Sequence, residues 1–186
     1  MKPFITKITD EIYTISQLLT ADECDYYRKL SEKIGFEEAK VGMPSGQKMY
    51  KNIRNNDRAI IKDFEIAEIL WNRVKPILPS VFADLKAFGL NEMIRFYRYD
   101  KSQRFKGHID GRYQSTTEIE SRMSFLVYLN DDYQGGETKF RTRNIKIKAK
   151  KGSALCFVHE QWHEGSPVLQ GRKYVLRSDV MYQVIK

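Results

Sequence analysis

The chain has 186 residues, of which 41% are hydrophobic and 12% aromatic, and its formal net charge is +8. This composition supplies a real core and excludes a disordered chain, and the length suits one domain. No apolar run approaches the roughly 18–20 residues that span a bilayer. The first residues also lack the apolar core of a secretory signal, so we expect a cytoplasmic protein with no membrane partner. Cys24 and Cys156 lie far apart in sequence, which excludes a disulfide framework and a cysteine-based metal finger.

The N-terminal part predicts a strand followed by a helix. Residues 11–17 have the composition of a strand. Thr20 and Glu23 have the spacing of a capping box, in which each side chain bonds the backbone N–H of the other residue. Gly35 can end the helix that this box opens. Four side chains at helical spacing form its expected buried face: Cys24, Tyr27, Leu30 and Ile34.

A polar loop over residues 40–56 precedes a second predicted helix over residues 63–75, which Pro76 limits. Its expected buried face consists of Ile66, Ile69, Leu70 and Val74. The basic stretch that precedes the second helix, residues 51–58, is either a contact for substrate or an ordinary solvated segment.

After Gly89 short β-type segments separated by turns dominate, which favours a sandwich or barrel. No boundary signal divides the chain. We therefore expect one domain over residues 1–186, with a helix-rich support over 1–90 and a β core over 91–186. The expected strands of this core are Met93–Tyr99, 123–129, 138–142, Ala154–Val158 and 173–182.

All three histidines of the chain, His108, His159 and His163, lie in the predicted β core. His108 and Asp110 are two residues apart, so in an extended segment their side chains point to the same side and can bind one ion. A second histidine would complete the two-histidine, one-carboxylate set of non-haem iron(II) oxygenases, which leaves positions open for a 2-oxo acid and dioxygen. A His-x-Asp pattern alone is common by chance, and these residues alone leave His159 and His163 as alternatives.

The second half of the chain resembles the prolyl 4-hydroxylase type of the iron(II)/2-oxoglutarate-dependent dioxygenase superfamily. The resemblance covers roughly residues 93–182 and is carried by several motifs together. These are Tyr99 nine residues before His108-Ile109-Asp110, then Tyr128-Leu129-Asn130-Asp131-Asp132, Gly135-Gly136-Glu137-Thr138 with Phe140, Gly152-Ser153-Ala154-Leu155 with Phe157, and His163 with Pro167, Val168, Gly171 and Lys173.

The resemblance implies a mainly β fold with N-terminal helices (α+β), built on a double-stranded β-helix, the cupin-like jelly roll. It implies iron(II) bound by His108, Asp110 and His163, with 2-oxoglutarate and O2 as cosubstrates and ascorbate as an accessory reductant. Lys173, ten residues after His163, would pair with the distal carboxylate of 2-oxoglutarate, whereas Leu169 stands ten residues after His159. This spacing favours His163 as the ligand.

Further residues would serve the cosubstrate in the same resemblance. Tyr99 and Tyr128 match positions whose hydroxyls bond 2-oxoglutarate, although both could equally be core residues. Arg177 lies four residues after Lys173 and faces the same side of a regular strand. It could assist the carboxylate of the cosubstrate, contact the substrate or pair with Asp179.

The implied reaction is hydroxylation of an unactivated C–H bond on a prolyl or other protein side chain, with release of succinate and CO2. A free amino acid or another small molecule is the alternative substrate, and a non-enzymatic jelly-roll module for an acidic partner is the alternative of a different class. Residues 139–151 contain seven basic residues. Their alternation indicates a solvated strand face, and the alternative is a docking surface for nucleic acid or an acidic protein. The oligomeric state stays open.

Overall fold

The computed structural model describes residues 2–43, 46–82 and 84–185. Its largest element is a ten-stranded sheet in which neighbouring strands pair antiparallel. The strands are β1 (Phe4–Thr9), β2 (Ile12–Ser16), β3 (Glu37–Glu38), β6 (Asp57–Lys62), β7 (Val81–Phe82), β8 (Leu85–Leu90), β9 (Met93–Tyr99), β11 (Ile119–Tyr128), β15 (Ala154–Val158) and β18 (Lys173–Val184). The main order is β1-β2-β15-β11-β18-β9-β6-β3. Strand β8 lies off this path: it pairs with the C-terminal part of β18 and with β7.

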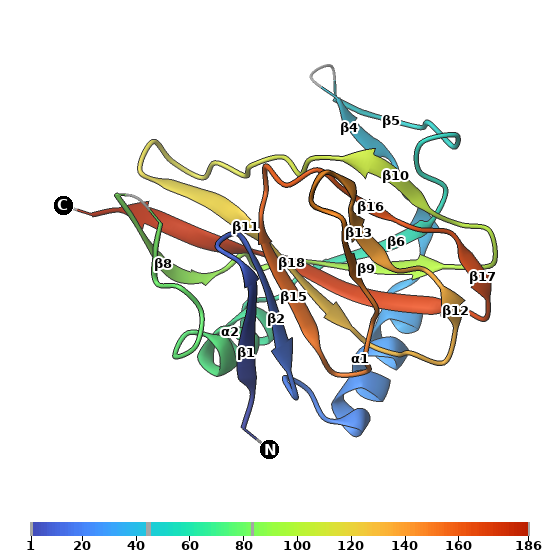
Figure 1. Ribbon diagram of the computed structural model, residues 1–186, viewed down its shortest axis with the longest axis horizontal. Coiled ribbons are helices and arrows are strands. Elements are labelled where there is room, and N and C mark those ends of the chain that lie inside the picture. The colour runs from blue at the N-terminus through green and yellow to red at the C-terminus, as the bar shows by residue number, and fades with distance from the viewer. Residues whose placement is uncertain (1, 44–45, 83, 186) are drawn as a thin grey trace.

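A smaller four-stranded sheet packs against one face of this large sheet, and together they form the expected double-stranded β-helix (Figure 1). Its order is β10-β16-β13-β14. The bounds are β10 (Phe105–His108), β16 (His163–Gly165), β13 (Thr138–Phe140) and β14 (Ile145–Ile147). Two short ribbons complete the described strands: β4 (Val41–Met43) with β5 (Gly46–Lys48), and β12 (Gln134–Gly135) with β17 (Val168–Gln170).

Both predicted helices are present and lie together on the other side of the large sheet (Figure 1). Helix α1 (Ala21–Ile34) begins with both hydrogen bonds of the predicted capping box and ends at Gly35. Helix α2 (Phe64–Val74) is capped by the Asp63 side chain. Ile69 was expected on its buried face but is exposed, and Ala67 is buried instead. No helix among the described residues is long and apolar enough to cross a bilayer.

The large sheet separates two apolar clusters, because successive side chains of a strand point to opposite faces. Phe96 and Leu176 belong to the cluster beneath the helices, whereas Tyr97 and Val175 belong to the cluster between the two sheets. Residues 173, 175 and 177 of β18 therefore all face the smaller sheet, where they line one cavity.

The sequence pattern missed several strands of residues 1–90, since β1, β3, β6, β7 and β8 all join the large sheet. The predicted strand over 138–142 ends at Phe140, and the chain continues as a 3-10 turn, Arg141–Arg143. The predicted loop over 40–56 contains the β4–β5 ribbon, and Pro44 and Ser45 lie outside the described residues. The strand predicted over 123–129 starts earlier, at Ile119.

The capping box gives a stability prediction. Replacing Thr20 with Ala removes the acceptor for the Glu23 N–H at the start of α1, so the free energy of unfolding should fall by about 1 kcal/mol. Thr20→Ser keeps the hydroxyl and should lose much less. Chemical denaturation of the three proteins measures the difference, and equal stability of the Ala and Thr proteins would contradict the role of the cap.

Candidate active site

A small cavity lies between the two sheets, and its lining includes the side chains best suited to bind a metal ion or an anion. Its floor comes from β9 and β18, and its other walls come from β10, β11, β13 and β16. The lining residues are Tyr97, Tyr99, Phe105, His108, Asp110, Leu126, Thr138, His163, Gly165, Lys173, Val175 and Arg177.

Among the described residues, His108, Asp110 and His163 form the one group suited to holding a metal ion, with ligand atoms within 4.8 Å of one another. His108 ends β10 and His163 begins β16, and the two residues are register partners in the smaller sheet. Asp110 follows β10 directly, and its two carboxylate oxygens lie 3.6 Å from the Nε2 atoms of His108 and His163. Strand pairing thus brings together the three residues that the sequence singled out.

Both histidines present a free Nε2 atom to this point. The Nδ1 atom of His108 lies 2.8 Å from the Lys106 carbonyl, and that of His163 lies 2.9 Å from the Gln161 carbonyl. A carbonyl can only accept, so Nδ1 carries the proton and the Nε2 lone pair is available to a metal. Burial lowers the pKa of His163 to about 4, which keeps this imidazole neutral.

The Asp110 carboxylate is buried and remains ionised. Burial alone would raise its pKa, but the Arg177 guanidinium holds the pKa well below its ordinary value. Arg177 donates to Oδ1 at 2.9 Å, and the Ser124 hydroxyl donates to Oδ2. A hard anionic ligand therefore lies beside two imidazole nitrogen ligands, and this donor set fits iron(II).

Lys173 lies at the other end of the cavity and suits an anionic ligand. Its Nζ donates to the Gly136 carbonyl at 2.6 Å and lies 5.3 and 5.5 Å from the ring centres of Tyr99 and Tyr128. Burial lowers the pKa of Lys173 to about 8. An ammonium group with one carbonyl acceptor and no carboxylate contact among the described residues can bind the acid end of a small ligand.

The other three residues predicted to serve the cosubstrate, Tyr99, Tyr128 and Arg177, make different contacts. Tyr99 lines the cavity, whereas the Tyr128 hydroxyl bonds Thr138 Oγ1 at 3.0 Å. Of the three roles considered for Arg177, the contacts match the ion pair with Asp179 and add one with Asp110. Sequence reasoning missed Phe105, whose ring stacks on that of His108 with centroids 3.5 Å apart.

His159 is not part of the metal group, because both of its ring nitrogens bond serine hydroxyls. Trp162 is half-exposed and packs so closely on Gly107 that a Cβ at position 107 would lie 2.8 Å from the indole nitrogen. Glu164 pairs with Arg141, outside the metal group.

The basic stretch 139–151 is not the regular strand face that its alternation indicated, since it contains the turn Arg141–Arg143. Four of its seven basic side chains have carboxylate partners: Arg141, Arg143, Lys146 and Lys151. This internal pairing reduces the charge available to an acidic macromolecule.

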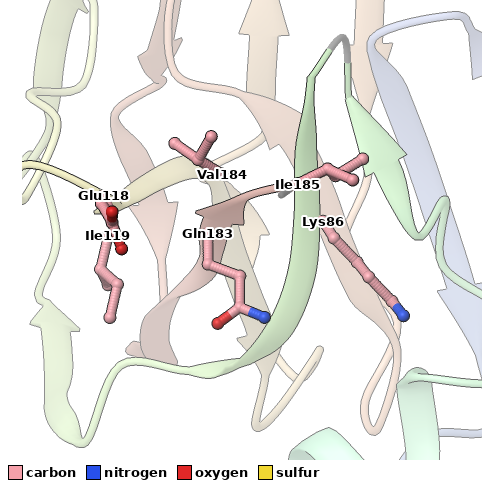
Figure 2. Close-up of a pocket in the computed structure, with 6 residues that line it drawn as sticks. All are labelled: Lys86, Glu118, Ile119, Gln183, Val184 and Ile185. Carbon is pink, nitrogen blue, oxygen red and sulfur yellow. The ribbon is translucent and has the colours of Figure 1, made fainter.

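A second hollow, at the end of β18, is lined by Lys86, Glu118, Ile119, Gln183, Val184 and Ile185, and this set contains no histidine (Figure 2).

Comparison with known proteins agrees with this geometry. The model of the 2OG-Fe(II) oxygenase superfamily matches residues 94–178. A PKHD-type hydroxylase of Alteromonas mediterranea is 30% identical, over 86% of this chain and 73% of the relative. Prolyl 4-hydroxylase 1 of Arabidopsis thaliana is 22% identical, over 94% of this chain and 70% of the relative.

Solved structures share the fold. A viral collagen prolyl hydroxylase from Paramecium Bursaria Chlorella virus-1, solved with 2OG, has a TM-score of 0.69 at 20% identity and covers 95% of this chain and 97% of its own. A Trichoplax adhaerens prolyl hydroxylase, solved with a fragment of the oxygen degradation domain of hypoxia inducible factor, has a TM-score of 0.73 at 17% identity, over 92% of this chain and 84% of its own.

The position of Arg177 predicts how metal binding responds to pH. Arg177→Gln removes the cation that lowers the Asp110 pKa, so this pKa should rise and protons should compete with iron. The ratio of variant to wild-type iron affinity should therefore fall as the pH is lowered from 8 to 6, in anaerobic titrations. Arg95→Gln is the control, because Arg95 pairs with Asp179 and not with Asp110. A ratio that is independent of pH would contradict this role.

Proposed function

Because the chain belongs to the 2OG-Fe(II) oxygenase superfamily, its reaction is a 2-oxoglutarate-dependent hydroxylation, and we propose that its substrate is a prolyl or other side chain of a protein. The names of its relatives support this substrate class, since they are PKHD-type and prolyl 4-hydroxylases. The structural relative from Trichoplax adhaerens was solved with a peptide. A free amino acid is the alternative substrate.

The observation that carries the proposal is the meeting of His108, Asp110 and His163 within 4.8 Å. We assign iron(II) to these three residues. When bound there with 2-oxoglutarate, the metal supplies the oxidative chemistry that converts O2 and the 2-oxo acid into succinate, CO2 and a hydroxylated product. The chain's own part is to hold the three ligands in place and to present one C–H bond to the metal.

We assign the distal carboxylate of 2-oxoglutarate to Lys173. Its buried ammonium can form a charge-assisted hydrogen bond, which is strong in a site that excludes water. Tyr99 lines the same part of the cavity and is the hydroxyl we place nearest the cosubstrate. Burial raises the pKa of Tyr99 to about 12, so it stays a neutral hydrogen-bond donor.

The proposed function predicts a specific product. Proline-containing peptides incubated with the protein, iron(II), ascorbate and 2-oxoglutarate should gain one oxygen, with one succinate formed per modified residue. Mass spectrometry and succinate assay measure the two products. Free L-proline is tested in parallel, and its preferential oxidation would overturn the protein side chain as substrate.

The control for this experiment is removal of a metal ligand. His108→Ala, Asp110→Ala and His163→Ala should each abolish turnover and weaken iron binding, because each removes one of three ligands. Retention of iron affinity by His163→Ala would show that the ligand assignment is wrong.

Lys173 gives a second pH prediction. With a pKa of about 8 in the absence of 2-oxoglutarate, Lys173 is charged below pH 8 and loses its proton above it. The affinity for 2-oxoglutarate should therefore be constant below pH 8 and fall by up to about tenfold per pH unit above it. Anaerobic calorimetry between pH 7 and 9 measures this. Lys173→Arg is the matched control, since arginine stays charged throughout, and an identical decline in both proteins would contradict the assignment.

A further inference from the structure

His159 is completely buried, lies four residues before the metal-group histidine His163, and takes no part in the metal group. Both of its ring nitrogens are nevertheless engaged. Nδ1 lies 2.9 Å from Ser124 Oγ, and Nε2 lies 2.9 Å from Ser121 Oγ. The two serines lie on β11, three residues apart across a register shift of that strand, and they hold the imidazole from both sides.

The direction of each hydrogen bond follows from Asp110. The Ser124 hydroxyl has one proton, and it donates that proton to Asp110 Oδ2. Ser124 must then accept from His159, which places the imidazole proton on Nδ1. The Nε2 lone pair accepts from Ser121, whose oxygen in turn accepts the Tyr113 backbone N–H at 2.8 Å.

His159 also contacts Asp110 through the main chain. The Asp110 N–H donates to the His159 carbonyl at 3.1 Å. The same residue therefore holds Asp110 at two points: the backbone directly, and carboxylate oxygen Oδ2 through Ser124. With Oδ2 engaged by Ser124 and Oδ1 by Arg177, rotation of the carboxylate about its Cβ–Cγ bond would break both contacts.

We propose that Ser121, His159 and Ser124 form a directed hydrogen-bond chain whose task is to orient the Asp110 carboxylate toward the metal. This inference rests on the proposed metal site and names its positioning residues. His159 touches neither metal nor cosubstrate; it acts through Ser124. The chain starts at the backbone of Tyr113, in the segment between Asp110 and β11, so it also ties that segment to the metal ligand.

The experiment compares iron(II) affinity, measured by anaerobic calorimetry, in single variants. Ser124→Ala and His159→Leu should each weaken iron binding on the order of 10–100-fold, which is the usual effect of losing a group that orients a metal ligand. Ser124→Thr keeps the hydroxyl and should restore affinity. The double variant should be no weaker than either single one, because both break the same chain. The d–d absorption of cobalt(II) bound in place of iron should shift in the same variants.

Ser178→Ala is the matched control. Ser178 is equally buried, lies on the neighbouring strand β18 and donates its hydroxyl to the Asn91 carbonyl at 2.6 Å, away from Asp110. It should lose stability while iron affinity and the cobalt spectrum stay unchanged, which separates a positioning role from a purely structural one.

The outcomes distinguish failure of the inference from failure of the metal site. If His108→Ala abolishes iron binding but Ser124→Ala binds iron as tightly as the wild type, the chain does not position Asp110. Additive losses in the double variant would also refute it. If His108→Ala leaves iron binding intact, the metal site itself is misassigned. Should His159→Leu fail to fold, the comparison of Ala, Thr and wild type at position 124 still decides.

Discussion

A carboxylate removed from water must be met by donors and cations around it, and Asp110 imposes this requirement on the site. Its two oxygens are reached from two neighbouring strands, by Arg177 of β18 and Ser124 of β11. The register of these strands places Leu126 opposite Arg177 and Ser124 opposite Asp179. A slip of one residue would turn one of the two side chains to the other face of the sheet, so the packing that sets the register also sets the charge of the site.

The basic side chains behind the net charge of +8 include exposed and buried ones, and the two kinds have different consequences. Several surface cations form exposed pairs, which contribute little to stability and are screened by salt. Lys173 and Arg177 are different because they are buried beside the cavity. Arg177 is balanced by Asp110 and Asp179, whereas Lys173 is met by a carbonyl and two aromatic rings. The charge of Lys173, which no described carboxylate pairs with, therefore lies where a dianionic cosubstrate would bind.

The helices, several strands and the His108–Asp110 pair could be predicted from local signals, whereas the choice of His163 and the double-stranded β-helix came from the family resemblance. The capping box of α1, the apolar β-type runs of β9 and β15 and the His-x-Asp spacing all lie within a few residues. The short strands β3 and β7 could not be predicted, since two residues carry no period and pair only through distant partners. The contacts of Ser124 and His159 depend on strand pairing over 35 residues of sequence separation. The strand face of Ser124 could have been read from the sequence, because Ser124 lies four residues before Tyr128 and therefore on the same face of the strand.

The three members of the metal group are oriented by different means. Each histidine donates Nδ1–H to the carbonyl two residues before it, so its direction is set within its own short segment. Asp110 depends instead on β11, on β18 and on the segment around His159. A small displacement between the two sheets would leave each imidazole on its own carbonyl but would change the carboxylate contacts. The geometry of the metal group is thus most sensitive at Asp110, which also carries the only negative charge of the group and would therefore set the net charge of the proposed metal site.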